Sequence, residues 1–216
     1  MALPVLRVGL IGNGTVGSAF ASALESNQER LTQRLGARVR LTQVAVQHPD
    51  RHRTSLAGVR IHNDAEGLAL DHSVDIVVEA SGAPEASQWL HRAITRGAAA
   101  VSANKQAIAA DRTLLELLAD RHPLLHCEAA VAAALPIVRA LRDSLDGEEI
   151  HNIRGVLNGT TTYILTQIER GARFRDALTR HCGPLTATSI RAAPKRSRRC
   201  ATPPQAHAGR MRARRP

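Results

Sequence analysis

The sequence has few aromatic residues, few cysteines and no long apolar run, and each shortage excludes a class of protein. One tryptophan, one tyrosine and two phenylalanines occur in 216 residues, which argues against nucleic-acid recognition by base stacking. Three cysteines cannot form a disulfide framework, so we predict a protein of the reducing cytoplasm. The apolar runs are too short to span a membrane, and the N-terminus has the pattern of a strand rather than of a signal peptide.

Acidic residues are almost absent from the last part of the chain. Residues 1–169 contain 16 Arg and Lys against 18 Asp and Glu, whereas residues 170–216 contain 13 against one. The formal net charge of +10 therefore comes from the C-terminal segment. From Pro184 onward the chain is rich in arginine and proline and poor in large apolar side chains, so we predict disorder there. A solvated tail is favoured over electrostatic attachment to nucleic acid.

A glycine-rich turn near the N-terminus is the most informative motif. The predicted strand Val5–Ile11 leads into Gly-Asn-Gly-Thr-Val-Gly at residues 12–17, and an amphipathic helix is expected from about Val16 to Leu31. In such a motif the first glycine permits a tight turn, the second lets the backbone approach a pyrophosphate, and the third lets the helix pack on the strand. The amides at the helix start favour negative charge. We interpret the motif as a dinucleotide site, with a structural turn as the alternative.

Strands and helices alternate along the chain to about residue 170. Further strands are predicted at Arg38–Val46, Val74–Glu79, Ala98–Ser102, Pro123–Cys127 and Glu148–Leu157, and helices at 84–95, 107–120, 136–145 and 161–169. Short apolar strands are typical of a parallel sheet that is buried on both faces. The predicted fold class is therefore α/β, a doubly wound, Rossmann-like parallel sheet with right-handed crossovers.

The residues after the second predicted strand bear on the choice of cofactor. An acidic residue there binds the ribose hydroxyls of NAD, whereas a nearby arginine accommodates the extra phosphate of NADP. Asp50 could serve the first role, and Arg51 or Arg53 the second. Basic residues outnumber the acid if His52 is counted, so we favour NADP, with Arg51 as a ligand. NAD, or an ordinary solvated loop, remains the alternative.

Lys105 is the second residue that the sequence singles out. The chain has 27 arginines but only two lysines, and the other, Lys195, belongs to the basic tail. Lysine carries a compact ammonium that suits proton transfer or contact with a substrate oxygen. Lys105 follows the predicted strand Ala98–Ser102, at the sheet edge where open α/β folds bind ligands. We predict a catalytic role; an incidental lysine at a helix start is the alternative.

Four further runs, taken with the glycine motif, resemble the homoserine dehydrogenase family. They are Val78-Glu-Ala-Ser-Gly82, Ser102-Ala-Asn-Lys105, Cys127-Glu-Ala-Ala-Val-Ala-Ala-Ala-Leu-Pro-Ile137 and Gly155-Val-Leu-Asn-Gly-Thr-Thr-Thr-Tyr-Ile-Leu165. The resemblance covers about residues 5–178 in matching order and spacing, and the last run is highly specific. It implies NAD(P)H-dependent reduction of L-aspartate 4-semialdehyde to L-homoserine, on the route to threonine and methionine.

The resemblance also implies roles for particular residues. The implied cofactor-binding residues are Gly12, Asn13, Gly14, Thr15, Val16, Gly17, Ser81 and Gly82, with Lys105 beside the nicotinamide and the substrate. The positions that hold a monovalent cation, usually sodium, through backbone carbonyls are Glu128, Val131, Ala133 and Leu135. The expected partners are a small-molecule substrate and a second subunit in a homodimer. The expected domains are 1–128 for the dinucleotide, 129–178 as an incomplete α/β substrate domain, and 179–216 as a disordered basic tail.

The chain departs from the family pattern in three places. Alanines stand at 132–134 where the family usually has glycines, and Gln47 stands where it often has arginine. After Leu178 the family continues into a Glu-x-Asp-Pro segment, an aspartate and a second lysine that donates the proton. None of these follows here. We hypothesise a shift of reading frame near codon 178, which reading the other two frames of the coding DNA would test.

Three functional interpretations follow. The first is a homoserine dehydrogenase in which a lysine protonates the developing alkoxide. The second is an inactive fragment that still binds NAD(P)H, and the third is a nucleic-acid-binding module that acts through the tail. We favour the first for ancestry and the second for behaviour, because the expected proton donor is missing. If the strand Glu148–Leu157 forms, its edge is unpaired and promotes aggregation.

Overall fold

A computed structural model describes residues 3–51, 56, 58–131, 135–145, 147–155 and 159–180. The chain divides between residues 146 and 147 into two compact units. Each unit is described by itself. The tail predicted to be disordered begins at residue 179, but residues 179 and 180 belong to a helical segment, and from residue 181 onward the prediction falls outside the described residues.

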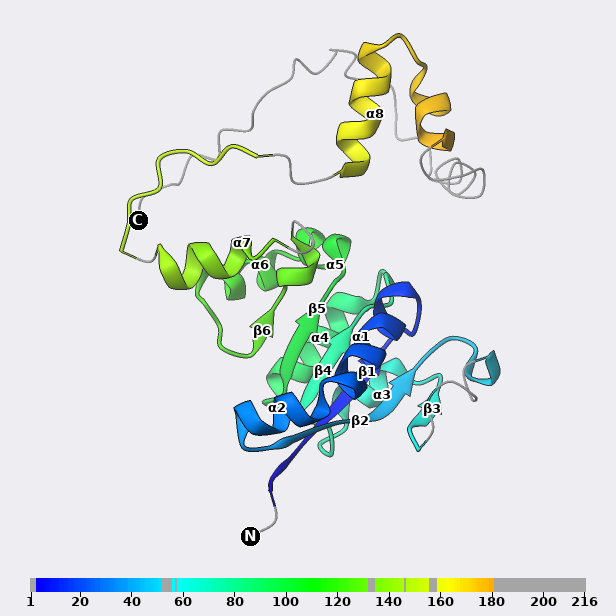
Figure 1. The fold of residues 1–216 in the computed structure, drawn as a ribbon, viewed down its shortest axis with the longest axis vertical. Helices are drawn as coiled ribbons and strands as arrows, with labels where there is room; N and C mark the ends of the chain where they lie inside the picture. Colours follow the sequence, from blue (N-terminus) through cyan, green and yellow to red (C-terminus); the bar gives the residue numbers. More distant parts are fainter. Residues whose placement is uncertain are drawn as a thin grey trace. The chain divides into compact units, whose positions relative to one another are not determined.

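The first unit is built on one parallel sheet of six strands in the order β3-β2-β1-β4-β5-β6 (Figure 1). The strands are β1 (Val5–Ile11), β2 (Arg38–Ala45), β3 (Arg60–His62), β4 (Ile76–Glu79), β5 (Ala99–Ser102) and β6 (Leu125–His126). This is the strand order of doubly wound dinucleotide-binding folds. The order in which strands are added reverses between β1 and β4, although all strands stay parallel. The predicted fold class is confirmed.

Helices cover the sheet from two sides and produce two hydrophobic cores. The helices are α1 (Thr15–Ser26), α2 (Gln28–Leu35), α3 (Ala65–Leu70), α4 (Ala86–Thr95), α5 (Lys105–Ala110), α6 (Arg112–Ala119) and α7 (Ile137–Arg139). Ala21 and Leu24 of α1 pack in one core with Val8 of β1. Leu68 of α3 and Leu90 of α4 belong to the other. The connection from β1 through α1 to β2 crosses the sheet in one direction, and the connection from β3 through α3 to β4 crosses it in the other. Because both crossovers are right-handed, α1 and α3 lie on opposite faces of the sheet.

Two helices that the sequence predicts as continuous are broken in the structure. The expected helix from Val16 to Leu31 is divided at Asn27, whose backbone N–H and side-chain amide both donate to Ala23 O. The expected helix 107–120 is divided at Asp111, which accepts from the N–H of Leu114 at 3.1 Å and so begins α6. Local side-chain hydrogen bonds of Asn and Asp compete with a continuous helix.

Short elements complete the first unit. The sequence analysis missed β3 and α3, and three single turns occur at η1 (Pro49–Arg51), η2 (Glu128–Ala130) and the π-helical η3 (Ala140–Ser144). The three residues of β3 pair with Gln43–Ala45 of β2. A strand of this length depends on its neighbour, because its own residues show no periodic apolar pattern.

The second unit contains α8 (Gly159–Glu169) and a helical segment at 174–180. Ile164 packs with Ala177 and Leu178 in a small core. The predicted strand Glu148–Leu157 is wrong over its described residues, because 148–155 are neither strand nor helix. The aggregation expected from an unpaired edge of this strand therefore does not apply to those residues. Across the described parts of both units, no helix has the length and apolarity that crossing a membrane requires.

Candidate functional site

The glycine turn joins β1 to α1 at the point between β1 and β4 where the strand order of the sheet reverses. Gly12 has a φ of +90°, and a Cβ there would lie 2.5 Å from the Cα of Ser81. A Cβ on Gly17 would overlap the carbonyl oxygen of Gly12. Both positions therefore require glycine for internal reasons. Gly14 differs, because a Cβ there would meet no atom within 4 Å and would project into open space at the N-cap of α1.

A cavity of about 690 Å³ opens beside this turn, and we call it the β2-side cavity. Its walls come from the turn after β1, the end of β2 and the loop after β4. The lining residues include Gly12, Asn13, Gly14, Gln47, His48, Arg51, Ser81, Gly82 and Trp89. The cavity therefore lies at the carboxyl edge of the sheet, at the switch point where open α/β folds bind ligands.

A second cavity of about 530 Å³, the β5-side cavity, lies between the starts of α1 and α5. It is lined by Gly14, Thr15, Val16, Ala80, Ser81, Gly82, Ala103, Asn104, Lys105 and Gln106. Asn104 caps α5 by accepting from the N–H groups of Gln106 and Ala107, each at 3.1 Å. This cap sets where α5 begins, and Lys105 is its first residue.

The two cavities share Gly14 and the segment 80–82 as lining residues. They are therefore neighbouring compartments along one edge of the sheet, divided by the glycine turn and the loop after β4. An extended ligand with a charged group near its middle fits this shape. The start of α1 would face that charge with its free backbone N–H groups.

The end of β2 supplies His48 and Arg51 to the β2-side cavity. Gln47 is also among the described lining residues. Asp50 is not, although it belongs to turn η1 together with Arg51. His52 and Arg53, the other basic candidates, fall outside the described residues. The described residues after β2 thus bring basic side chains to this cavity, whereas its acidic lining residue, Glu85, follows β4.

Behind the loops of the β5-side cavity lie polar residues whose importance the sequence analysis missed. Glu79 and Ser102 are fully buried, and Asn104 is nearly so. Ser102 Oγ donates to the carboxylate of Glu79 at 2.7 Å. All three belong to the quoted runs 78–82 and 102–105, but no local pattern showed that the two runs would meet. That information appears only when β4 pairs with β5.

The positions predicted for a cation lie near the start of α7. The carboxylate of Glu128 accepts from the N–H groups of Val138 and Arg139, at 3.1 and 3.0 Å. Its carbonyl oxygen accepts from Val131 N, and that of Leu135 from Ile137 N. Ala133 falls outside the described residues, as do its neighbours 132 and 134. Within the described residues no cluster of His, Cys, Asp or Glu side chains could hold a metal ion, which leaves carbonyl ligation untouched.

A third, apolar cavity of about 640 Å³ shares no described lining residue with the other two. It lies between α1, α2 and the sheet, and its walls include Leu6, Phe20, Leu31, Ile76 and Val101. Its few polar lining groups are Arg30 and Arg34 of α2 and Asn27, which lies between α1 and α2. A binding site needs convergent polar groups to orient a ligand, so we place the candidate site in the two polar cavities.

Comparisons with known proteins identify the family of the chain. The family model described as the NAD-binding domain of homoserine dehydrogenase matches residues 12–131, and the model described as homoserine dehydrogenase matches residues 136–182. The first covers more than half of the chain. Both are models of the enzyme and do not favour the interpretation as an inactive fragment.

Similar proteins carry the same name. The homoserine dehydrogenase of Helicobacter pylori is 39% identical over 175 residues, which are 80% of this chain and 41% of that protein. The crystal structure of the enzyme from Thiobacillus denitrificans has a TM-score of 0.70 at 33% identity, over 83% of this chain and 43% of that one. A hyperthermophilic archaeal homoserine dehydrogenase, solved with NADPH, shares the fold with a TM-score of 0.66 at 23% identity, over 86% and 61%.

This chain therefore spans about two fifths of the length of the curated relatives that it matches. The part matched by the first family model contains β2 to β6, the glycine turn and every described lining residue of the two polar cavities except Ile11, the last residue of β1. On the strength of the family models and of this shared architecture, the chain belongs to the homoserine dehydrogenase family.

Proposed function

We propose that the chain is an NAD(P)H-dependent oxidoreductase that interconverts L-aspartate 4-semialdehyde and L-homoserine. The carrying observation is that two cavities share the glycine turn as a wall, and that the one beside α5 is lined by Lys105. A dinucleotide has two ends joined by a charged pyrophosphate, which suits two compartments divided by a helix N-terminus. The substrate is that of the family.

The residues present fit a dinucleotide. Gly14 leaves open the space that a Cβ would fill, so a pyrophosphate can approach the backbone between Asn13 and Gly17. Thr15 and Val16 begin α1 and present their N–H groups there. Ser81 and Gly82 line both compartments and would lie against the cofactor. The β2-side cavity would take the adenosine end and the β5-side cavity the nicotinamide end.

NADP(H) is the preferred cofactor in this proposal. Arg51 lines the β2-side cavity, where it would pair with a 2′-phosphate, and His48 offers a second donor. Asp50, the acid that would bind the free ribose hydroxyls of NAD, is not among the described lining residues; the acid that does line the cavity, Glu85, follows β4 rather than β2. The archaeal homoserine dehydrogenase of similar fold was solved with NADPH.

The reaction needs a hydride, a polarised carbonyl and a proton. When bound, NAD(P)H would supply the hydride for reduction of the aldehyde. Lys105, the first residue of α5, would hold the aldehyde oxygen by hydrogen bonding and protonate the alkoxide as it forms. Lys195 is the only other lysine of the chain, so in this proposal Lys105 takes over the proton donation that the family pattern assigns to a second lysine after residue 178.

Three further features belong to the proposal. Carbonyls of Glu128, Val131, Ala133 and Leu135 would hold a monovalent cation, sodium by preference; hard oxygen ligands suit such an ion. Replacing sodium by choline in a thermal melt tests this site. The working form is a homodimer in the cytoplasm, and the mass of the purified protein in solution tests the first part of that statement.

The decisive experiment measures binding and turnover on the full chain. Binding is followed by the fluorescence of NADPH, and turnover by the absorbance of NADPH during oxidation of L-homoserine with NADP. We expect a saturable fluorescence change and homoserine-dependent formation of NADPH. Lys105→Ala should reduce turnover by about 100-fold while NADPH affinity changes by less than about threefold.

Lys195→Arg is the matched control, because it changes the only other lysine, which belongs to the basic tail. It should leave both measurements unaltered. Binding without turnover would identify the inactive fragment instead of the enzyme. Absence of both would overturn the proposed function. Salt-sensitive DNA binding that disappears when residues 179–216 are deleted would support the nucleic-acid module.

A further inference from the structure

Glu79 and Ser102 lie at matching ends of adjacent strands. Each is the last residue of its strand, β4 and β5, and the two are paired in register. Both side chains are completely buried. Ser102 Oγ donates to Glu79 Oε2 at 2.7 Å. A polar pair in this position would be costly without further partners.

Further partners are present, and they close a ring of hydrogen bonds. On the β4 side, the N–H and O–H groups of Ser81 donate to Glu79 Oε1 at 2.8 and 2.7 Å. The N–H of Ala83 then donates to Ser81 Oγ at 3.1 Å. On the β5 side, the N–H of Asn104 donates to Ser102 Oγ at 3.0 Å. The side-chain amide of Asn104 donates to the carbonyl oxygen of Ala83 at 3.1 Å and completes the ring.

The direction of every hydrogen bond in the ring is determined by its donors. Backbone and amide N–H groups can only donate, so the hydroxyl oxygens of Ser81 and Ser102 accept from them. Each serine then has its own proton left to give, and both give it to Glu79. A carboxylate is the one side chain that can accept all three donations at once. Donation to an ionised group gives the stronger class of hydrogen bond.

The ring lies directly behind the wall of the β5-side cavity. Ser81, Gly82, Asn104 and Lys105 line that cavity, whereas the described lining residues do not include Glu79 or Ser102. Asn104 also caps α5, so the ring determines where Lys105 begins the helix. Movement of the ring would therefore shift the two loops relative to each other.

We propose that Glu79 is a positioning residue, which holds the loop of Ser81 and Gly82 and the start of α5 at Lys105 in the relative places that the nicotinamide end of the cofactor requires. Glu79 acts through Ser81, Ser102 and Asn104 and does not itself contact the ligand. This inference rests on the proposed function for the identity of the ligand. The geometry of the ring stands independently of it.

Ser102→Ala and Glu79→Gln test the inference. The first removes one donor and one acceptor with the smallest change in volume, and the second keeps the size of the side chain but replaces one acceptor by a donor. The probes are NADPH and adenosine 2′,5′-bisphosphate, which would occupy only the β2-side cavity. We expect each variant to raise the Kd for NADPH about tenfold. The Kd for adenosine 2′,5′-bisphosphate should remain within about twofold of the wild-type value.

Hydrogen exchange of the ligand-free protein is the second measurement. Both variants should accelerate exchange about tenfold at amides 81–83 and 104–107, while β1 and β2 keep their wild-type protection. Asp111→Ala is the matched control: it removes a comparable helix cap outside both cavities. It should leave NADPH affinity unchanged.

The outcomes separate the inference from the proposed function. Wild-type protein that fails to bind NADPH overturns the proposed function, and exchange at amides 81–83 and 104–107 then decides the role of the ring. Equal weakening of both probes, or exchange accelerated throughout the sheet, shows general destabilisation and overturns the positioning role. Unchanged exchange in Ser102→Ala overturns it as well, and this variant remains informative if Glu79→Gln does not fold.

Discussion

Gly17 packs against the carbonyl oxygen of Gly12 so closely that a single added carbon would overlap it. Gly17→Ala should therefore displace α1 from β1 and lower the free energy of unfolding by about 2 kcal/mol or more. Gly14→Ala should leave the free energy of unfolding within about 1 kcal/mol of wild type, because its Cβ meets open space. It should weaken NADPH binding about tenfold, by occupying the path of the pyrophosphate. Urea unfolding and fluorescence titration compare the two variants, and equal stability losses would contradict this division.

Arg51 should decide between the two dinucleotides. Because it lines the β2-side cavity, Arg51→Ala should raise the Kd for NADPH by about 10- to 100-fold, the size of a lost hydrogen bond to a charged group. The Kd for NADH should change little, because NADH lacks the 2′-phosphate. Asp50→Ala serves as the comparison variant. If Asp50→Ala weakens the binding of NADH while Arg51→Ala leaves the binding of NADPH unchanged, Asp50 is the ribose ligand and the protein prefers NAD.

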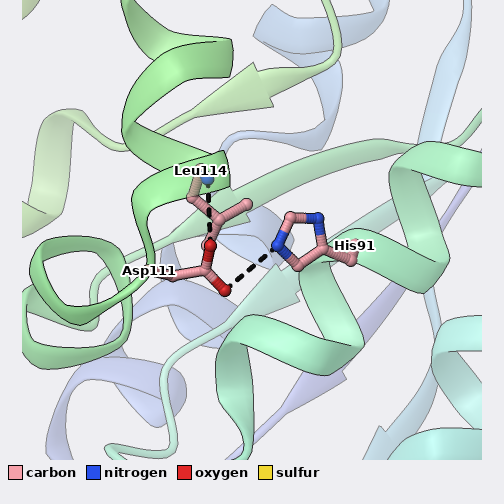
Figure 2. A network of polar contacts seen from close by, with 3 residues as sticks. All are labelled: His91, Asp111 and Leu114. Atoms are coloured by element: carbon pink, nitrogen blue, oxygen red, sulfur yellow. Dashed lines mark hydrogen bonds and ion pairs between the residues drawn. The ribbon is translucent and has the colours of Figure 1, made fainter.

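Asp111 should stabilise the first unit only when it is ionised. Its carboxylate accepts from His91 Nε2 on α4 and from Leu114 N in α6, both at 3.1 Å (Figure 2). Burial raises the pKa of Asp111, but these hydrogen bonds and the nearby His91 together outweigh it, so the pKa lies below the ordinary 3.8. The stabilisation is therefore complete above about pH 4 and is lost as the pH falls through the lowered pKa.

Asp111→Ala should lower the free energy of unfolding by about 1 kcal/mol at pH 7. The difference from wild type should shrink towards pH 2, where the wild-type carboxyl is protonated. Asp111→Asn should cost less, because an asparagine can still cap α6. Chemical unfolding at pH 7 and pH 3 measures these values. A constant difference at both pH values would show that the cap acts without its charge.

Asp71 provides a second acid-sensitive contact, at the end of α3. Hydrogen bonds from Gln43 and from Ser73 lower the pKa of Asp71 to about 2. The ionised Asp71 therefore stabilises the folded state fully at pH values above its ordinary pKa of 3.8. This stabilisation is lost as the pH falls through its folded-state pKa of about 2. Because Asp71 is partly exposed to solvent, Asp71→Ala should cost only about 1 kcal/mol at neutral pH. Thermal melts between pH 2 and pH 7 should show the two proteins converging at the acid end.

Cys127 should be a slow thiol in the native protein. It is 2% exposed, and burial, followed by the neighbouring Glu128, raises the pKa of its thiol. In a Cys182→Ser, Cys200→Ser background, reaction with a disulfide reagent at pH 8 should be at least about tenfold slower than in urea. Rapid labelling of the folded protein would show that the end of β6 opens readily. NADPH should not alter the rate, because Cys127 lines neither polar cavity.

The longer elements of the first unit were predictable because their apolar patterns are local. The prediction of β1 as Val5–Ile11 is confirmed to the residue, and those of β2 and β5 to within one residue at an end. The prediction failed where tertiary contacts decide. Arg60–His62 becomes β3 only because β2 offers an open edge. Residues 148–155, which were predicted to begin a strand, are not in a strand in the second unit.

The candidate site was predictable residue by residue but not as an arrangement. Gly12 and Lys105 could be singled out because a positive φ and a rare residue type are local signals. Glu79 could not, because a glutamate at the end of an apolar strand has no local signal of burial. Its hydrogen bond to Ser102 spans 23 residues and exists only after β4 and β5 pair.

The sequence by itself therefore determined the alternation of strands and helices, the conformation of the glycine turn and the family to which the chain belongs. These follow from side-chain periodicity and from the steric needs of single residues. The tertiary structure alone decided that the loops after β1, β4 and β5 meet around two cavities. It also decided that a buried carboxylate joins two of those loops. Parallel pairing is the physical reason, because it brings together strand ends that are far apart in the chain.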